Sequence, residues 1–162
     1  TLILFAANTI LGPKISELYY NNQMQRLTKT VQNTAKYTFL LSLPIFGVIL
    51  FFPDLLLALF GSEFNNKLAI ETLIILSIGQ MTNVFFGTVI YILDMTGKQN
   101  VSKNILLFTA FVNIAFNWYL IPIYGIKGAA IATAISIFCW TILGAIYVKK
   151  HLNFYAFPIF KN

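Results

Sequence analysis

Residues 104–126 read NILLFTAFVNIAFNWYLIPIYGI and residues 128–148 read GAAIATAISIFCWTILGAIYV, with only Lys127 between them. The two stretches have 23 and 21 residues, and neither contains Lys, Arg, Asp or Glu. A helix needs roughly 20 apolar residues to cross the hydrocarbon core of a bilayer. Pro122 and Gly125 lie where the first stretch ends, and both residues favour a turn. This part of the sequence therefore predicts a transmembrane helical hairpin.

The rest of the chain continues the same pattern. Residues 72–93 form another charge-free run, and residues 37–53 form a fourth that continues past Asp54 into more apolar sequence. We expect a polytopic, all-α bundle of transmembrane helices that is one part of a longer protein. The predicted map has a truncated helix at 1–12, an amphipathic cytoplasmic connector at 13–36, four spans at about 37–59, 69–93, 103–121 and 126–147, and a segment at 148–162 that is a cytoplasmic tail or the start of a further helix.

The overall composition agrees with lipid as the main solvent. The chain of 162 residues is 58% hydrophobic and only 10% charged, whereas an average soluble domain is about 25% charged. This excludes an ordinary soluble enzyme and a disordered segment. The apolar runs are continuous rather than alternating, which favours helices over a membrane barrel. With one Cys and one His in the chain, we expect no metal site, no cofactor and no internal disulfide.

The basic residues predict the orientation. The net charge is +6, and short cytoplasmic loops of membrane proteins carry an excess of Lys and Arg. Segments 13–36, 94–103 and 149–151 hold eight basic residues (Lys14, Arg26, Lys29, Lys36, Lys98, Lys103, Lys149 and Lys150), whereas the alternate loops hold two, Lys67 and Lys127. We therefore place the first group in the cytoplasm. Because these charges are dispersed along membrane edges, we expect no nucleic-acid partner.

Segment 13–36 has helical periodicity. Ile15 and Leu18 fall on one face, and Leu27, Val31 and Ala35 follow at a spacing of four. This pattern predicts one or two amphipathic helices at the interface between membrane and cytoplasm. Two roles remain open: a connector that spaces two spans, and a basic surface that attracts anionic headgroups or a pyrophosphate.

Several polar residues lie inside the predicted spans. Ser77, Gln80 and Asn83 share one helix face, and Asn113 and Asn117 lie four residues apart. Polar groups in a transmembrane helix either bind a neighbouring helix or line a polar path. We assign Asn113 and Asn117 to helix packing, and we keep Gln80 and Asn83 as candidates for the substrate path. Asp54 is interpreted as a helix cap near the outer interface, with proton coupling as the alternative.

The stretch from Asn113 to Thr133 resembles a known family. It contains two asparagines, Ile121-Pro122, Tyr124-Gly125 and then Gly128-Ala129-Ala130-Ile131-Ala132-Thr133. This order is similar to that in bacterial polysaccharide-export flippases of the multidrug/oligosaccharidyl-lipid/polysaccharide exporter superfamily. Two weaker matches, Leu43-Pro44 and Leu59-Phe60-Gly61 followed by Phe64, extend the resemblance over most of the chain.

The resemblance implies a fold and a substrate. The family fold has roughly twelve to fourteen helices in two pseudo-symmetric lobes around an alternately open cavity. This chain would be most of the second lobe, and its partner would be the N-terminal lobe of the same protein. The implied substrate is an undecaprenyl-pyrophosphate-linked oligosaccharide in the bacterial inner membrane. The implied cavity wall consists of Asn8, Thr9, Tyr37, Thr38 and Ser42.

Other functions remain possible from the sequence. A cation-coupled multidrug antiporter of the same superfamily would share this pattern of spans. A membrane-embedded glycosyltransferase or polymerase would need a large polar loop, which the short predicted outer loops disfavour. A purely structural membrane subunit is a further alternative. The four spans contain no basic residue at mid-membrane, so hydroxyls and amides, or the missing lobe, would hold an anionic headgroup. We expect a transporter rather than an enzyme.

Overall fold

The computed structural model describes residues 2–61 and 66–158, and every regular element in these two ranges is a helix. In chain order the helices are α1 (Leu2–Tyr20), α2 (Met24–Phe51), α3 (Pro53–Ala58), α4 (Lys67–Phe86), α5 (Val89–Met95), α6 (Gln99–Tyr124) and α7 (Ile126–Leu152). Four of them, α2, α4, α6 and α7, are long and apolar enough to cross a membrane. The prediction of an all-α bundle with four spans is confirmed.

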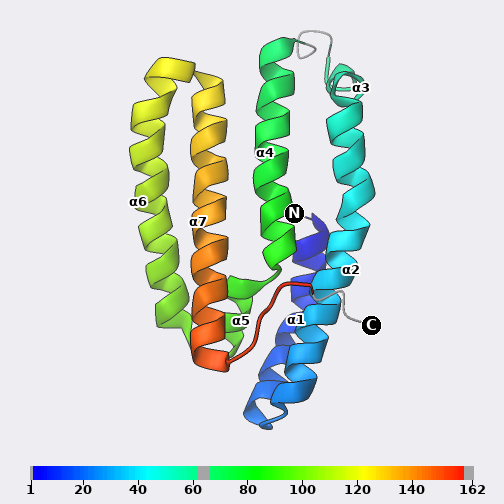
Figure 1. Cartoon of the computed structure of the whole chain (residues 1–162), viewed down its shortest axis with the longest axis vertical. Coiled ribbons are helices and arrows are strands. Elements are labelled where there is room, and N and C mark those ends of the chain that lie inside the picture. Colours follow the sequence, from blue (N-terminus) through cyan, green and yellow to red (C-terminus); the bar gives the residue numbers. More distant parts are fainter. Residues whose placement is uncertain (1, 62–65, 159–162) are drawn as a thin grey trace.

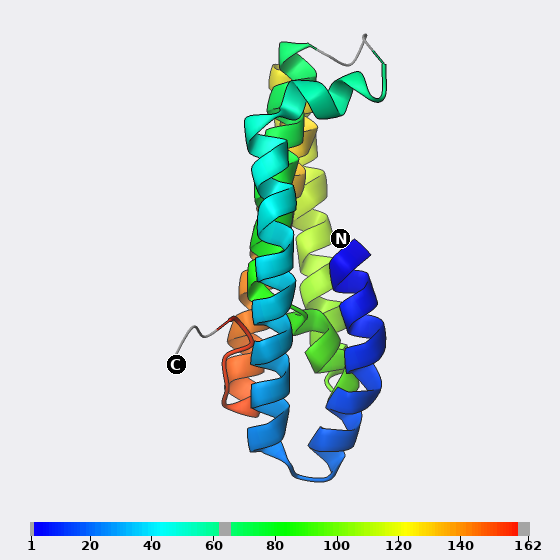
Figure 2. The same ribbon diagram turned by 90° about the vertical axis from the view of Figure 1, so that its right-hand side faces the viewer.

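The long helices form a row. Figure 1 shows α6, α7, α4 and α2 side by side in that order, and α7 packs against both α6 and α4. Figure 2 shows α1 to one side of the row, beside the lower part of α2, with its first turns near mid-height. The short helix α3 lies at the upper end of α2, and the short helix α5 lies at the lower end of α4.

The structure divides segment 13–36 between two helices. Of the one or two amphipathic helices predicted there, the structure has two helical parts, since α1 continues through Pro13 to Tyr20 and α2 begins at Met24. The tight turn between them is fixed by the Gln23 amide, which donates to the Leu18 carbonyl at 2.9 Å, and by Asn22, which has a φ of 56°. The apolar stripes predicted in this segment pack on each other and on α5, so they bury little surface in the bilayer.

The expected span at 69–93 is interrupted. Helix α4 ends at Phe86, and Gly87 has φ 70° and ψ −150°, a conformation that a residue with a Cβ atom rarely adopts. The chain then turns through Thr88 into α5, whose Val89, Ile92 and Leu93 are buried. A continuous apolar run concealed this break because one glycine in such a run does not by itself predict a turn.

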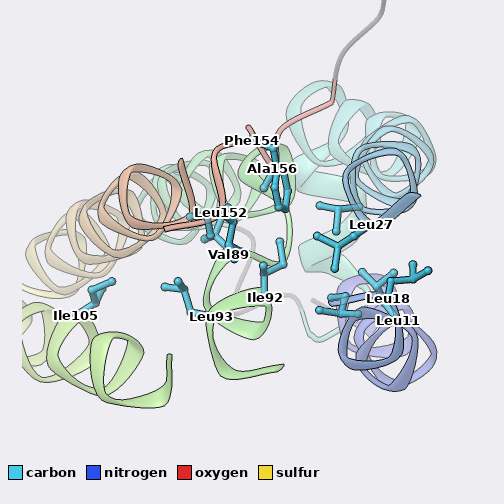
Figure 3. Packing of buried hydrophobic residues seen from close by; sticks show 13 residues of the cluster. Leu11, Leu18, Leu27, Val89, Ile92, Leu93, Ile105, Leu152, Phe154 and Ala156 are labelled. Atoms are coloured by element: carbon cyan, nitrogen blue, oxygen red, sulfur yellow. The ribbon is translucent and has the colours of Figure 1, made fainter. Parts of the chain in front are cut away.

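The buried core lies at the lower end of the bundle. Its members come from α1, α2, α5, α6 and α7 and from the segment after α7, and Figure 3 shows how they converge around α5. After α7 ends at Leu152, the non-helical residues 153–158 fold back, which buries Phe154 and Ala156. Higher in the bundle, α2 and α6 expose large apolar side chains, such as Phe51 and Trp118. Such surfaces suit a lipid solvent.

The two ends of the bundle differ in charge. The α1–α2 turn, the α5–α6 turn and the end of α7 lie at the lower end, whereas α3 and the α6–α7 turn lie at the upper end (Figure 1). The loops that the sequence groups on one side of the membrane therefore share one end. At the upper end, Glu71 of α4 pairs with Lys127 of α7 and lies 3.9 Å from Lys67. The single Glu71 carboxylate thus balances one of the two positive charges that Lys67 and Lys127 place at this end.

Candidate functional site

A pocket of about 200 Å³ lies where α1, α4, α5 and α7 meet. Its polar lining combines side chains from four elements: Asn8 of α1, Asn83 of α4, Thr88 and Tyr91 at the start of α5, and Trp140 and Thr141 of α7. Residues that are far apart in the sequence therefore converge on one small space inside an otherwise apolar bundle.

Two glycines allow the helices to approach closely around α5. A methyl group at Gly12 of α1 would lie 2.7 Å from Cε1 of Tyr91, and one at Gly144 of α7 would lie 2.6 Å from Cγ2 of Val89. Both distances are shorter than an ordinary van der Waals contact. The absence of a side chain at these positions lets α1 and α7 enclose the start of α5, where the Gly87 break places Thr88 and Tyr91.

Two polar atoms at this junction are buried without a partner among the described residues. They are the Asn8 carbonyl oxygen Oδ1, which can only accept a hydrogen bond, and the Trp140 nitrogen Nε1, which can only donate one. Leaving such a group unsatisfied costs about 1–3 kcal/mol. A neutral group that both donates and accepts, such as a hydroxyl, could pair with either kind of atom.

The structure brings together two of the predicted path residues. Asn8 and Asn83 line this pocket, and Asn83 is buried. Gln80 lies one turn earlier on α4, where its Oε1 is also buried without a partner in the described ranges, but it does not line the pocket. The sequence pattern and the family resemblance each proposed one of the two asparagines.

The other predicted wall residues lie elsewhere. Thr9 is exposed and donates to the Phe5 carbonyl at 3.0 Å, and the Tyr37 side chain is 69% exposed. Thr38 donates to the Thr34 carbonyl at 2.7 Å, and Ser42 donates to the Thr38 carbonyl at 2.8 Å. The hydroxyl protons of Thr9, Thr38 and Ser42 are thus used within their own helices.

Asn113 and Asn117 form a pair within α6. The Asn117 side-chain nitrogen donates to the backbone oxygen and to Oδ1 of Asn113, both at 2.9 Å. Asn113 also lines a second, shallower pocket of about 270 Å³ between α6 and α7, with Thr133 and Ser136 opposite. Trp140 borders both pockets.

Sequence analysis did not identify Trp140, Thr141, Thr88 or Tyr91 as site residues. A signal for Trp140 existed, since Gly128, Ala132 and Ser136 recur at a spacing of four and Trp140 and Gly144 continue that row. The positions of Thr88 and Tyr91 in the pocket depend on the helix break at Gly87, which the sequence periodicity did not predict.

The described residues offer no arrangement for metal binding. No group of three His, Cys, Asp or Glu side chains in residues 2–61 and 66–158 is close enough to hold an ion. Cys139 is a free thiol, and the His151 ring stacks on Tyr147 with ring centres 6.0 Å apart. The chemistry available in the pocket is therefore hydrogen bonding by neutral amide, indole and hydroxyl groups.

Residues 1–119 match the sequence model of the MatE family. An uncharacterized membrane protein of Methanocaldococcus jannaschii, MJ1068, is 31% identical over 150 residues, which is 92% of this chain and 29% of that protein. The probable low-salt glycan biosynthesis flippase Agl15 of Haloferax volcanii is 31% identical over 151 residues, covering 91% of this chain and 31% of Agl15. The capsular polysaccharide biosynthesis protein CapF of Staphylococcus aureus is 33% identical over 142 residues, covering 85% of this chain and 35% of CapF.

This chain spans about a third of the length of these relatives. No solved structure matches it significantly. The names of the relatives and the four long apolar helices agree on a multi-pass membrane protein.

Proposed function

Because this chain belongs to the MatE family, a family of transporters, we propose that it forms part of a flippase that moves a lipid-linked oligosaccharide across a cell membrane. The observation that carries this proposal is the family match over residues 1–119, together with two relatives named for glycan or polysaccharide biosynthesis. Transport by alternating access would require the remainder of the protein, since this chain has a third of the length of its relatives.

The Asn8 pocket suits the polar part of such a substrate. A sugar presents hydroxyl groups, each of which donates and accepts, and the pocket holds one unpaired buried acceptor and one unpaired buried donor among the described residues. The sugar would cross in contact with these groups while the lipid tail stays in the bilayer. Thr38 and Ser42 of α2 and Gln80 of α4, which do not line this pocket, would belong to a longer polar path.

The carrier and the membrane belong to the same proposal. We infer undecaprenyl pyrophosphate as the carrier and the bacterial inner membrane as the location, in keeping with the polysaccharide-export flippases that the sequence resembles. Rocking of the two lobes about a site near mid-membrane would expose the pocket to each side in turn.

Deletion of the full-length gene tests the function. We expect loss of the surface glycan and accumulation of its lipid-linked precursor, with both restored by the intact gene. A normal surface glycan with normal precursor levels would contradict the proposal. Sensitivity to cationic drugs with an unchanged glycan would instead assign the protein to the multidrug antiporters.

A further inference from the structure

Another polar pocket, distinct from the two described above, lies inside the α1–α2 hairpin, at the opposite end of α1 from Asn8. It has a volume of about 320 Å³ and is lined by Lys14, Glu17 and Leu18 of α1 and by Gln23, Arg26, Lys29, Thr30 and Asn33 around the start of α2. This volume is at the lower end of the roughly 300–1,000 Å³ that is typical of small-molecule sites. The hairpin is the lowest part of the bundle (Figures 1 and 2).

The charges of this pocket are unbalanced. Three cations, Lys14, Arg26 and Lys29, face one carboxylate, Glu17, which Lys14 binds at 2.9 Å through both oxygens. Arg26 donates from Nη1 to Gln23 Oε1 at 3.2 Å, which leaves the rest of its guanidinium group available. In the described part of the chain, neither Arg26 nor Lys29 pairs with an acid. The pocket therefore carries a net charge of +2, three cations less one anion.

The fold holds these groups in place. One face of α2 lies beside the pocket. It carries Arg26, Lys29, Thr30 and Asn33, which follow the helical spacing of three and four residues. The neighbouring face carries Leu27 and Val31, which are fully buried in the core against α1. Because that packing fixes the rotation of α2, Arg26 and Lys29 stay on one side of the helix, with their side chains exposed.

We propose that this basic pocket binds the phosphate group of a lipid headgroup at the membrane surface. Its position between two helices, at an end of the bundle beyond the apolar spans, is where basic pockets of membrane proteins meet headgroups. Guanidinium and ammonium groups are the side chains that bind phosphate oxygens most strongly. Gln23, Thr30 and Asn33 add neutral hydrogen-bonding groups. The proposal requires only that the chain lies in a bilayer, and it holds for a phospholipid or for a polyprenyl pyrophosphate.

The test measures lipid binding rather than transport, so its result is independent of the flippase proposal. The full-length protein is placed in nanodiscs of phosphatidylcholine with either phosphatidylglycerol or polyprenyl pyrophosphate added, and the retained lipid is quantified by native mass spectrometry. Arg26→Gln with Lys29→Gln removes the two cations without an acidic partner. The matched control is Lys103→Gln with Lys150→Gln, which removes two exposed charges at the same end but outside the pocket.

We expect the Arg26/Lys29 variant to retain about tenfold less anionic lipid, which corresponds to about 1.4 kcal/mol, and the Lys103/Lys150 variant to retain it normally. A loss confined to the polyprenyl pyrophosphate would identify the carrier lipid as the ligand, and a loss of both lipids would identify a general headgroup site. Equal losses in the two variants, or no loss in either, would overturn the proposal. Arg26→Lys with Lys29→Arg, which keeps the charge, separates lost binding from misfolding, since it should restore retention.

Discussion

Asn8 of α1 and Trp140 of α7 line the same pocket, and each contributes a buried polar atom without a partner in the described part of the chain. The two atoms are complementary, since Oδ1 of Asn8 accepts and Nε1 of Trp140 donates. A purely structural seam between helices would satisfy such atoms against each other or against the backbone. Their unsatisfied state is the reason why we propose this pocket, rather than another polar seam between helices, as a ligand site.

The first prediction concerns Trp140. Trp140→Phe removes the indole N–H but keeps an aromatic ring in the wall of the pocket. Removal of the buried, unpartnered nitrogen should raise the free energy of unfolding by about 1–3 kcal/mol, and the smaller phenyl ring should lower it through lost packing. We therefore expect little net change in the free energy of unfolding. Glycan export should fall at least fivefold if the N–H binds the substrate. Both quantities can be measured on the same purified or expressed protein.

The control is Trp118→Phe on α6, where the side chain is 83% exposed on the apolar surface. This variant should retain full export. If Trp140→Phe also retains full export, the N–H does not contact the substrate. If export and the free energy of unfolding fall together, the loss of export reflects misfolding and not a missing contact with the substrate.

A second prediction ranks the candidate wall residues. Asn8→Leu with Asn83→Leu removes two amides that face the pocket, whereas Thr38→Val with Ser42→Val removes two hydroxyls that already donate within α2. We expect export to fall by more than tenfold in the asparagine pair and by a smaller factor in the hydroxyl pair. Surface glycan, normalised to the amount of protein in the membrane, measures both. An equal loss of export in the two pairs would indicate that the substrate path includes α2 as well as the pocket. A larger loss in the hydroxyl pair would place the path along α2.

The sequence predicted the spans because each depends on a local property. A charge-free run of 21 or 23 residues has one stable arrangement in lipid, and α6 and α7 follow it closely. The hairpin of α1 and α2 was not predicted, because an amphipathic stripe serves equally well against a bilayer surface or against a second helix. Which of the two surfaces the stripe contacts depends on tertiary packing, and here Leu18 and Leu27 pack into one core.

The site was only partly predictable for a similar reason. Asn83 was proposed because polar residues within an apolar run stand out, and Asn8 was proposed from the family resemblance. Tyr91 and Trp140 enter the pocket because Gly87 ends α4 and because Gly12 and Gly144 permit close approach. Those effects depend on the backbone conformation at one glycine and on distances between helices, which one-dimensional periodicity does not contain.

A third prediction tests that close approach. Gly144→Ala introduces a methyl group 2.6 Å from Cγ2 of Val89, so the Val89 side chain or α5 must shift. We expect a loss of about 1–3 kcal/mol in the free energy of unfolding, seen as a lower melting temperature. Adding Val89→Ala removes the clashing methyl groups and should restore part of the loss, a coupling that a double-mutant cycle measures.

Gly47→Ala is the matched control for Gly144→Ala. A methyl group at Gly47 in α2 would meet no atom within 4 Å, and alanine favours a helix by roughly 0.5–1 kcal/mol over glycine. This variant should therefore be neutral or more stable. Additive effects of Gly144→Ala and Val89→Ala would show that the two helices do not touch at this point.

The last prediction concerns orientation, on which the side of the phosphate pocket depends. Eight basic residues lie in segments 13–36, 94–103 and 149–151, which include the turns and helix ends at the lower end of the bundle, and two, Lys67 and Lys127, begin helices at the upper end. The positive-inside rule therefore places the lower end in the cytoplasm. In a Cys139→Ser background, Asn21→Cys and Asn100→Cys report on the lower end, and Lys67→Cys reports on the upper end. All three side chains are exposed. A membrane-impermeant maleimide should label Lys67→Cys on intact cells and should label the other two only after permeabilisation. The inverse pattern would place the α1–α2 hairpin outside the cell, and the basic pocket would then meet headgroups of the outer leaflet.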